Sequence, residues 1–214
     1  SHIQAGHFSG QVMREFHRVF GNAGRGWIAP FKLGKSNEPD DYFIKSDIKD
    51  WICGKCIQHE RKTPIGIGGI GIRSFTSSIH WDVIITTVNG AGYAFNRAIL
   101  YRGDKAMPFL PTGRSKSDVR LASANSLCAL GVMADTLYCN QLVDTLFLQS
   151  SRRKVDSGEL LPASTFKNLY YGLSLTNGSP GILYHGIGVN GAMFTHYTDT
   201  AYVKQLALLQ PALL

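Results

Sequence analysis

The first regular pattern of apolar residues predicts an amphipathic helix near the start of the chain. Its members follow the helical spacing i, i+4, i+7 and i+8, and they are Val12, Phe16, Val19 and Phe20. Ser9 is suited to cap the start of this helix, and Gly21 is suited to end it. The sequence therefore predicts a polar loop over residues 1–7 that leads into a helix ending at Gly21.

The pattern changes over residues 32–179, where short runs rich in β-branched and aromatic residues alternate with turn signals. The clearest runs cover residues 81–88, 98–101, 142–148 and 166–175. Pairs such as Asn89-Gly90 after such runs favour hairpins. Only residues 121–134 are also compatible with a helix. Short strands at this spacing predict an antiparallel β-sandwich or jelly roll.

The last zone, residues 180–214, is predicted to return to an α/β pattern. Residues 181–184 have the composition of a strand, and a glycine-rich turn follows them. A helix capped by Thr198 or Asp199 comes next, and residues 212–214 have the character of another strand beginning. Strand, turn, helix and strand make half of a doubly wound unit. The chain stops inside that last strand, so we expect it to be a fragment.

Composition and charge narrow the class of protein only slightly. The 214 residues are 44% hydrophobic and 17% charged, which is typical of a folded globular chain. The net charge of +7 favours an anionic partner or simply solubility. The densest basic run, Arg152 to Lys154, lies beside acidic residues without interleaved aromatics, so nucleic acid is not an expected partner. No apolar run approaches the roughly 18 residues of a membrane span, and no signal segment stands at the start.

Two short motifs suggest cofactors, but neither has the neighbours that its cofactor needs. Cys53 and Cys56 form a close pair, yet a zinc site would want a second close pair, and a thioredoxin-like site would want a helix directly afterwards. The glycines from Gly66 to Gly71 satisfy G-x-G-x-x-G, yet the residues after them favour a strand. We expect no metal and no cofactor. The cysteines are expected to be buried thiols or structural disulfides, and the glycines a bulged or tightly packed strand.

Three segments carry a resemblance to a known family. Residues 1–6 read Ser-His-Ile-Gln-Ala-Gly just before the predicted helix, and residues 20–27 read Phe-Gly-Asn-Ala-Gly-Arg-Gly-Trp after it. Residues 184–192 read Tyr-His-Gly-Ile-Gly-Val-Asn-Gly-Ala in the late turn. Together they resemble the SGNH/GDSL serine hydrolases, in particular the bacterial branch related to peptidoglycan O-acetylesterases. The resemblance covers about a third of the 214 residues.

The resemblance implies two site residues and a reaction. Ser1 corresponds to the nucleophile of the family's first block, whose backbone N–H also serves the oxyanion hole, and Gly191 corresponds to the glycine whose backbone N–H helps to form that hole. A serine hydroxyl needs a base to take its proton, and the developing oxyanion needs fixed donors. The family's Gly-x-Asn block is expected just after Leu214. Its Asp-x-x-His block is absent, because none of the seven histidines has an aspartate three residues before it.

The resemblance therefore implies an exported hydrolase of acyl esters, acetyl esters above all, carried by a glycan or a cell-wall polymer. It predicts an α/β fold with a partial SGNH flavodoxin-like layer, built from residues 1–31 and 180–214, around an inserted antiparallel β-sandwich over residues 32–179. The sandwich resembles a carbohydrate-binding module. The helices of the two ends are expected to pack in one layer with strand 181–185, and the fragment itself is expected to be inactive.

Two alternatives stay open. One is an acyltransferase of the same fold, in which a sugar hydroxyl takes the acyl group in place of water. The other is a glycan-binding module without catalysis, in which exposed aromatic residues of the β-rich zone hold the sugar. The candidate aromatic residues are Trp51, Trp81, Tyr93, Tyr101, Tyr170 and Tyr171.

Overall fold

A computed structural model describes residues 4–49, 51–87, 92–121, 127–151 and 168–212. The chain begins with helix α1 (Ser9–Phe20) and strand β1 (Gly26–Ile28). Twelve strands in all are formed by the described residues, and four further helical segments follow α1. The remaining strands are β2 (Tyr42–Ser46), β3 (Ile52–Lys55), β4 (Ile70–Ser74), β5 (Ser78–Ile85), β6 (Phe95–Gly103), β7 (Leu110–Pro111), β8 (Val119–Leu121), β9 (Leu127–Ala129), β10 (Val132–Val143), β11 (Thr145–Ser151) and β12 (Asn168–Thr176). The short helix α2 (Ser115–Asp118) precedes β8, and η2 (Phe194–Tyr197), α3 (Thr200–Gln205) and η3 (Leu206–Leu209) follow β12.

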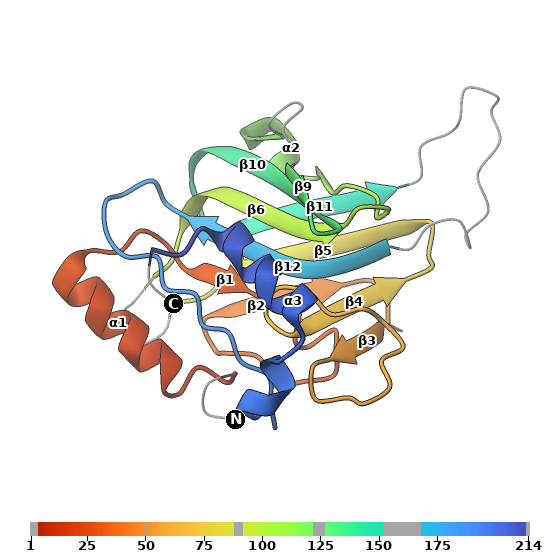
Figure 1. Ribbon diagram of the computed structural model, residues 1–214. Coiled ribbons are helices and arrows are strands. Elements are labelled where there is room, and N and C mark those ends of the chain that lie inside the picture. The colour runs from red at the N-terminus through yellow and green to blue at the C-terminus, as the bar shows by residue number, and fades with distance from the viewer. Residues whose placement is uncertain (1–3, 50, 88–91, 122–126, 152–167, 213–214) are drawn as a thin grey trace, which may run out of the picture.

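The strands form two sheets (Figure 1). The larger sheet has the order β3-β4-β12-β6-β10-β8, with β1 added to β12 and β9 added to β10. The smaller sheet has the order β2-β5-β11-β7. Every pair of these strands is antiparallel. The antiparallel sandwich predicted for the middle of the chain is therefore confirmed over its described residues.

Aromatic side chains fill the space between the two sheets. Trp81 of β5, Phe109 and Tyr170 of β12 lie with ring centroids 4.8 to 5.3 Å apart, and all three are fully buried. Along β5, buried residues alternate with partly exposed ones, as expected of a strand with one face on a core. These tilted aromatic rings supply much of the apolar burial that holds the sheets together.

The fold class predicted from the resemblance is wrong, because the described residues form two antiparallel sheets and no α/β layer. Residues 181–185 have only an isolated parallel bridge, between Asn22 and Ile182, within the described chain. A parallel sheet buries its strands on both faces, whereas residues 182–185 are only half-buried. Strand β1, from the N-terminal zone, joins the sandwich instead. Along one edge of β12, β4 pairs with the first half of the strand and β1 pairs with the second half, and Trp27 and Ile28 are buried there.

The end helices do not share a layer either. The C-terminal helical segment lies in front of the large sheet in Figure 1, while α1 lies at its side. Tyr101 of β6 donates from its hydroxyl to the Leu208 carbonyl at 3.3 Å, and Gln205 donates to the Leu130 carbonyl at the β9–β10 turn at 3.3 Å. Leu206, Leu208 and Leu209 of η3 are partly buried against the core, so the C-terminal segment packs on the sandwich and is tied to β6 and to the β9–β10 turn.

Helix α1 ends where it was predicted to end, but it begins one residue early, since Phe8 rather than Ser9 is its N-cap, and it does not bury the predicted face. It ends at Gly21, whose φ of +91° suits glycine. Met13 is its buried apolar residue, whereas Phe16, Val19 and Phe20 of the predicted stripe are exposed by 40 to 59%. Spacing alone identified the helix correctly, since the stripe has the helical period, but it did not identify which side of the helix meets the sandwich.

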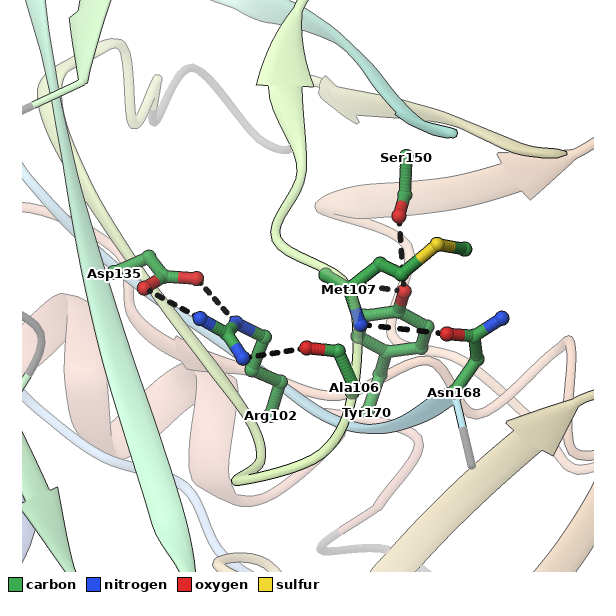
Figure 2. A network of polar contacts seen from close by, with 7 residues as sticks. All are labelled: Arg102, Ala106, Met107, Asp135, Ser150, Asn168 and Tyr170. Atoms are coloured by element: carbon green, nitrogen blue, oxygen red, sulfur yellow. Dashed lines mark hydrogen bonds and ion pairs between the residues drawn. The ribbon is translucent and has the colours of Figure 1, made fainter. Parts of the chain in front are cut away.

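A buried polar network closes the loop between β6 and β7 (Figure 2). Arg102 forms two hydrogen bonds with Asp135 and one with the Ala106 carbonyl. Asn168 accepts from the Met107 N–H at 3.3 Å. The Tyr170 hydroxyl contacts the Met107 carbonyl at 3.0 Å and the Ser150 hydroxyl at 3.3 Å. Because these polar groups provide one another's hydrogen-bond partners, we interpret the network as a structural support and not as a candidate site.

Candidate functional site

The two ends of the chain meet at a short set of hydrogen bonds. The Ile182 N–H donates to the Gly21 carbonyl at 3.0 Å, and the Ala23 N–H donates to the Ile182 carbonyl at 3.2 Å. The Asn190 N–H donates to Oε1 of Gln4, a residue 186 positions earlier in the chain. The predicted proximity of residues 1–31 and 180–214 is thus confirmed at these contacts, although the described residues form no α/β layer that would create it.

Gly191 lies in a tight turn beside this junction. The Ala192 N–H donates to the Val189 carbonyl at 2.9 Å, and Gly191 has a φ of +78°, which is the third-residue geometry of a type II turn. The residue is exposed, and the nearest atom to a Cβ built on it would be Ile57 Cδ1 at 4.0 Å. Within the described chain the Gly191 N–H has no hydrogen-bond acceptor. This N–H is therefore available to a ligand.

Two backbone N–H groups, one before Gly191 and one after it, are fixed by hydrogen bonds to side chains. The Val189 N–H donates to the Tyr197 hydroxyl at 3.2 Å, and the Met193 N–H donates to Nδ1 of His196 at 2.8 Å. Met193 and Phe194 nevertheless point away from the protein, and Phe194 is 96% exposed. An ordered turn thus presents two large apolar side chains close to Gly191 in the sequence.

A buried ion pair lies behind the junction, under α1. Arg25 Nε is 2.5 Å from Asp41 Oδ2, and the two side chains are 8 and 11% exposed. Arg25 also donates to the Trp27 carbonyl at 3.2 Å, and its guanidinium lies over the ring of Tyr42 at 5.3 Å. The cavity lined by Arg25 and Gln4 is about 10 Å³, which is room for a water molecule and not for a substrate.

Two histidines lie close to this ion pair and are poorly suited to serve as a base. Burial, with the Arg25 charge adding to it, lowers the pKa of His185 to about 4. Burial lowers the pKa of His17 as well, and Arg25 adds to this effect while the Ile182 carbonyl opposes it. A general base works best with a pKa near the operating pH. Neither imidazole therefore replaces the base that the resemblance places outside these 214 residues.

Of the two predicted site residues, only Gly191 belongs to the described part of the chain. Ser1 lies outside the described residues. Gly191 is described, with an exposed and unbonded N–H. Sequence reasoning missed Gln4 and the Arg25–Asp41 pair as parts of this region. Gln4 and Arg25 do lie within the segments that carry the resemblance, so the signal was present, but their partners are distant in sequence.

The other motifs are structural in the described chain. Cys53, Cys56 and Cys139 carry free thiols, and the Cys56 thiol contacts the Tyr197 hydroxyl. No group of three or more histidine, cysteine or acidic residues among the described positions could hold a metal ion. The glycines from Gly66 to Gly71 lead into β4 rather than into a helix. A Cβ at Gly66 would strike the ring of Tyr171 at 2.3 Å, so this run is tightly packed.

The aromatic residues proposed for glycan binding do not form a binding surface. All six are buried, with exposures of 7% or less: Trp51, Trp81, Tyr93, Tyr101, Tyr170 and Tyr171. An open groove of about 440 Å³ lies between α2 and the β10–β11 turn, and Arg114, Asp118 and Asp144 supply its charges. None of the sequence-predicted site residues lines this groove.

No protein-family model matches this chain, and no curated protein is significantly similar to it. Among the described residues, no helix has both the length and the apolar character to cross a lipid bilayer.

Proposed function

We propose that this protein is a serine-dependent hydrolase of acyl esters, acetyl esters above all, carried by a glycan or a cell-wall polymer. Ser1 attacks the acyl carbonyl and forms an acyl-enzyme, and the Gly191 N–H donates to the oxyanion. The asparagine, aspartate and histidine that complete the SGNH-type site come from residues outside these 214. These roles fall on individual site residues, and the described part of the chain forms no α/β layer around them.

The hydrogen bond between Asn190 and Gln4 gives this proposal its main support. The resemblance assigns the Ser1 block and the Gly191 turn to one site, although most of the chain separates them. Gln4 is the fourth residue of the first block, and Asn190 precedes Gly191. This bond joins the segment that follows Ser1 in the sequence to the turn that contains Gly191.

The chemistry of the turn agrees with this role. An oxyanion donor must be an N–H that has no internal acceptor and lies open to the substrate, and Gly191 meets both conditions within the described chain. Met193 and Phe194 offer an exposed apolar surface next to it, where the ring face of a sugar or an acyl group could pack. The net charge of +7 favours an anionic polymer.

The experiment measures hydrolysis of p-nitrophenyl acetate and release of acetate from O-acetylated peptidoglycan. A form of the protein extended at both ends should hydrolyse both substrates. Ser1→Ala should lower its turnover on the order of 10⁴- to 10⁶-fold, because triad members act as a unit. Ser77→Ala, which changes an exposed serine in the β4–β5 turn, is the matched control and should keep the wild-type rate.

The 214-residue chain should show essentially no serine-dependent turnover, since its histidines lack the family's orienting aspartate. Strong turnover by this chain that is abolished on changing one of its seven histidines would mean that a different site is at work. An extended form that hydrolyses acetyl esters equally well with Ser1→Ala would refute the assignment of the nucleophile.

A further inference from the structure

Gln4 uses every polar group of its side chain to join three segments. It is 2% exposed. Its Nε2 donates to Ser36 Oγ at 2.7 Å and to the Asn37 carbonyl at 2.5 Å, and its Oε1 accepts from the Asn190 N–H. The amide thereby ties the first block of the chain to the turn after Phe31 and to the turn that contains Gly191.

These partners require a glutamine in one orientation. If the amide were turned over, Oε1 would face the Asn37 carbonyl and Nε2 would face the Asn190 N–H, so that like groups would oppose each other. Methionine has a similar length but would leave the Asn190 N–H and the Asn37 carbonyl without partners. An ionised glutamate would place a charge in a buried position next to a carbonyl oxygen.

The bond to Asn190 also explains why the next N–H is available. The Asn190 N–H points inward to Gln4, and the turn then carries the Gly191 N–H to the surface, where it has no acceptor within the described chain. A shift of the Asn190 amide would move the Gly191 N–H with it, since only one peptide unit separates them.

We propose that Gln4 is a positioning residue of the esterase site, which sets the place of the Gly191 N–H relative to the segment that carries Ser1. This inference rests on the proposed function and names a residue to which neither the resemblance nor the reaction assigns a role. Gln4 acts through Asn190 and does not touch the reacting atoms. Its loss should therefore lower turnover more than it weakens substrate binding.

The test compares Gln4→Met and Gln4→Glu with wild type in the form extended at both ends, using p-nitrophenyl acetate. Gln4→Met should lower kcat on the order of 10²-fold, because a displacement of about 1 Å in a catalytic group has an effect of that size. KM should change much less. In Gln4→Glu, kcat relative to wild type should recover as the pH is lowered, since a protonated carboxyl can both donate to Asn37 and accept from Asn190.

Two matched variants separate positioning from general damage. Gln11→Met changes an exposed glutamine on α1 and should leave kcat and KM unchanged. Ser36→Ala removes one bond to Gln4 but keeps the bond to Asn190, so its kcat should stay within a few-fold of wild type. A kcat for Ser36→Ala as low as that of Gln4→Met would contradict the specific role of the Asn190 bond.

Amide hydrogen exchange in the 214-residue chain gives a readout that does not depend on activity. The Asn190 amide should exchange faster in Gln4→Met than in wild type. If the extended wild-type protein shows no Ser1-dependent turnover, the proposed function fails, and this exchange measurement still decides whether Gln4 holds the turn. If turnover is present but Gln4→Met keeps the wild-type kcat, the positioning role is overturned and the function stands. If Gln4→Met does not fold, a Gln4→Glu variant whose relative kcat is independent of pH overturns the role.

Discussion

Acid should destabilise this protein through His185, and replacing that residue by phenylalanine should remove much of the effect. The imidazole lies partly buried against the first strand, and its Nδ1 is buried without a hydrogen-bond partner among the described residues. Burial, with the Arg25 charge adding to it, lowers its pKa to about 4. In the unfolded chain a histidine takes its proton near pH 6.5. Between these two values the unfolded state binds more protons, so the free energy of unfolding falls as the pH falls.

The size of the effect follows from the same two values. The difference of about 2.5 pKa units corresponds to about 3 kcal/mol at 1.36 kcal/mol per unit, and the partly exposed edge of the ring reduces this to about 2 kcal/mol. This contribution is fully present above pH 6.5 and is lost as the pH falls through about 4. His17, whose pKa is also lowered by burial, adds a change of the same sign.

Urea unfolding at pH 7.5 and pH 4.5, followed by tryptophan fluorescence, measures this difference. The probes are Trp27, Trp51 and Trp81, which are all buried in the folded protein. Wild type should lose stability between the two pH values, and the loss in His185→Phe should be smaller by about 2 kcal/mol. Equal losses in the two proteins would show that His185 is not held neutral by its surroundings, and the reasoning would fail.

Further substitutions test the other structural assignments. Asp135→Asn should lower the free energy of unfolding by about 3 to 5 kcal/mol, because it leaves the buried Arg102 without its carboxylate; a loss below about 1 kcal/mol in urea unfolding would contradict this. Gly26→Ala should destabilise strongly, since its φ is +73° and a Cβ would lie 2.2 Å from the Tyr184 carbonyl oxygen. A wild-type melting temperature for that variant would rule out the close approach. Phe194→Ala should leave stability unchanged and raise KM for acetylated peptidoglycan but not for p-nitrophenyl acetate, and an equal KM on both would remove its role in polymer binding.

Local patterns predicted the strands of the sandwich well. The run over residues 98–101 lies inside β6, and the run over 166–175 matches β12 over its described residues, because β-branched and aromatic residues suit a half-buried pleated strand. The run over 142–148 was predicted as one strand, yet the chain turns at Asp144 between β10 and β11. A continuous apolar run does not reveal such a tight turn. The same kind of run led to the prediction of a strand over residues 181–184, which they do not form.

The candidate site was predictable only in part, since its contacts are long-range. The resemblance selected Gly191, which proved to have a positive φ and a free N–H in the described chain. Gln4 is an ordinary polar residue in its local sequence, and its importance comes from partners at Ser36, Asn37 and Asn190. Nothing in the spacing of a short segment specifies which distant backbone groups a buried amide will meet.

A glycine at position 191 has two separate physical explanations, and one substitution distinguishes them. The φ of +78° favours glycine for the turn alone, and alanine there should lower the free energy of unfolding by roughly 1 to 2 kcal/mol. The space around a Cβ is open, with Ile57 Cδ1 the nearest atom at 4.0 Å, so Gly191→Ala should still fold and keep its N–H. If glycine serves only the turn, kcat at a temperature where the variant is fully folded should equal that of wild type. If the N–H receives the oxyanion, the added methyl group occupies the surface that the acyl group must approach, and kcat should fall at that same temperature.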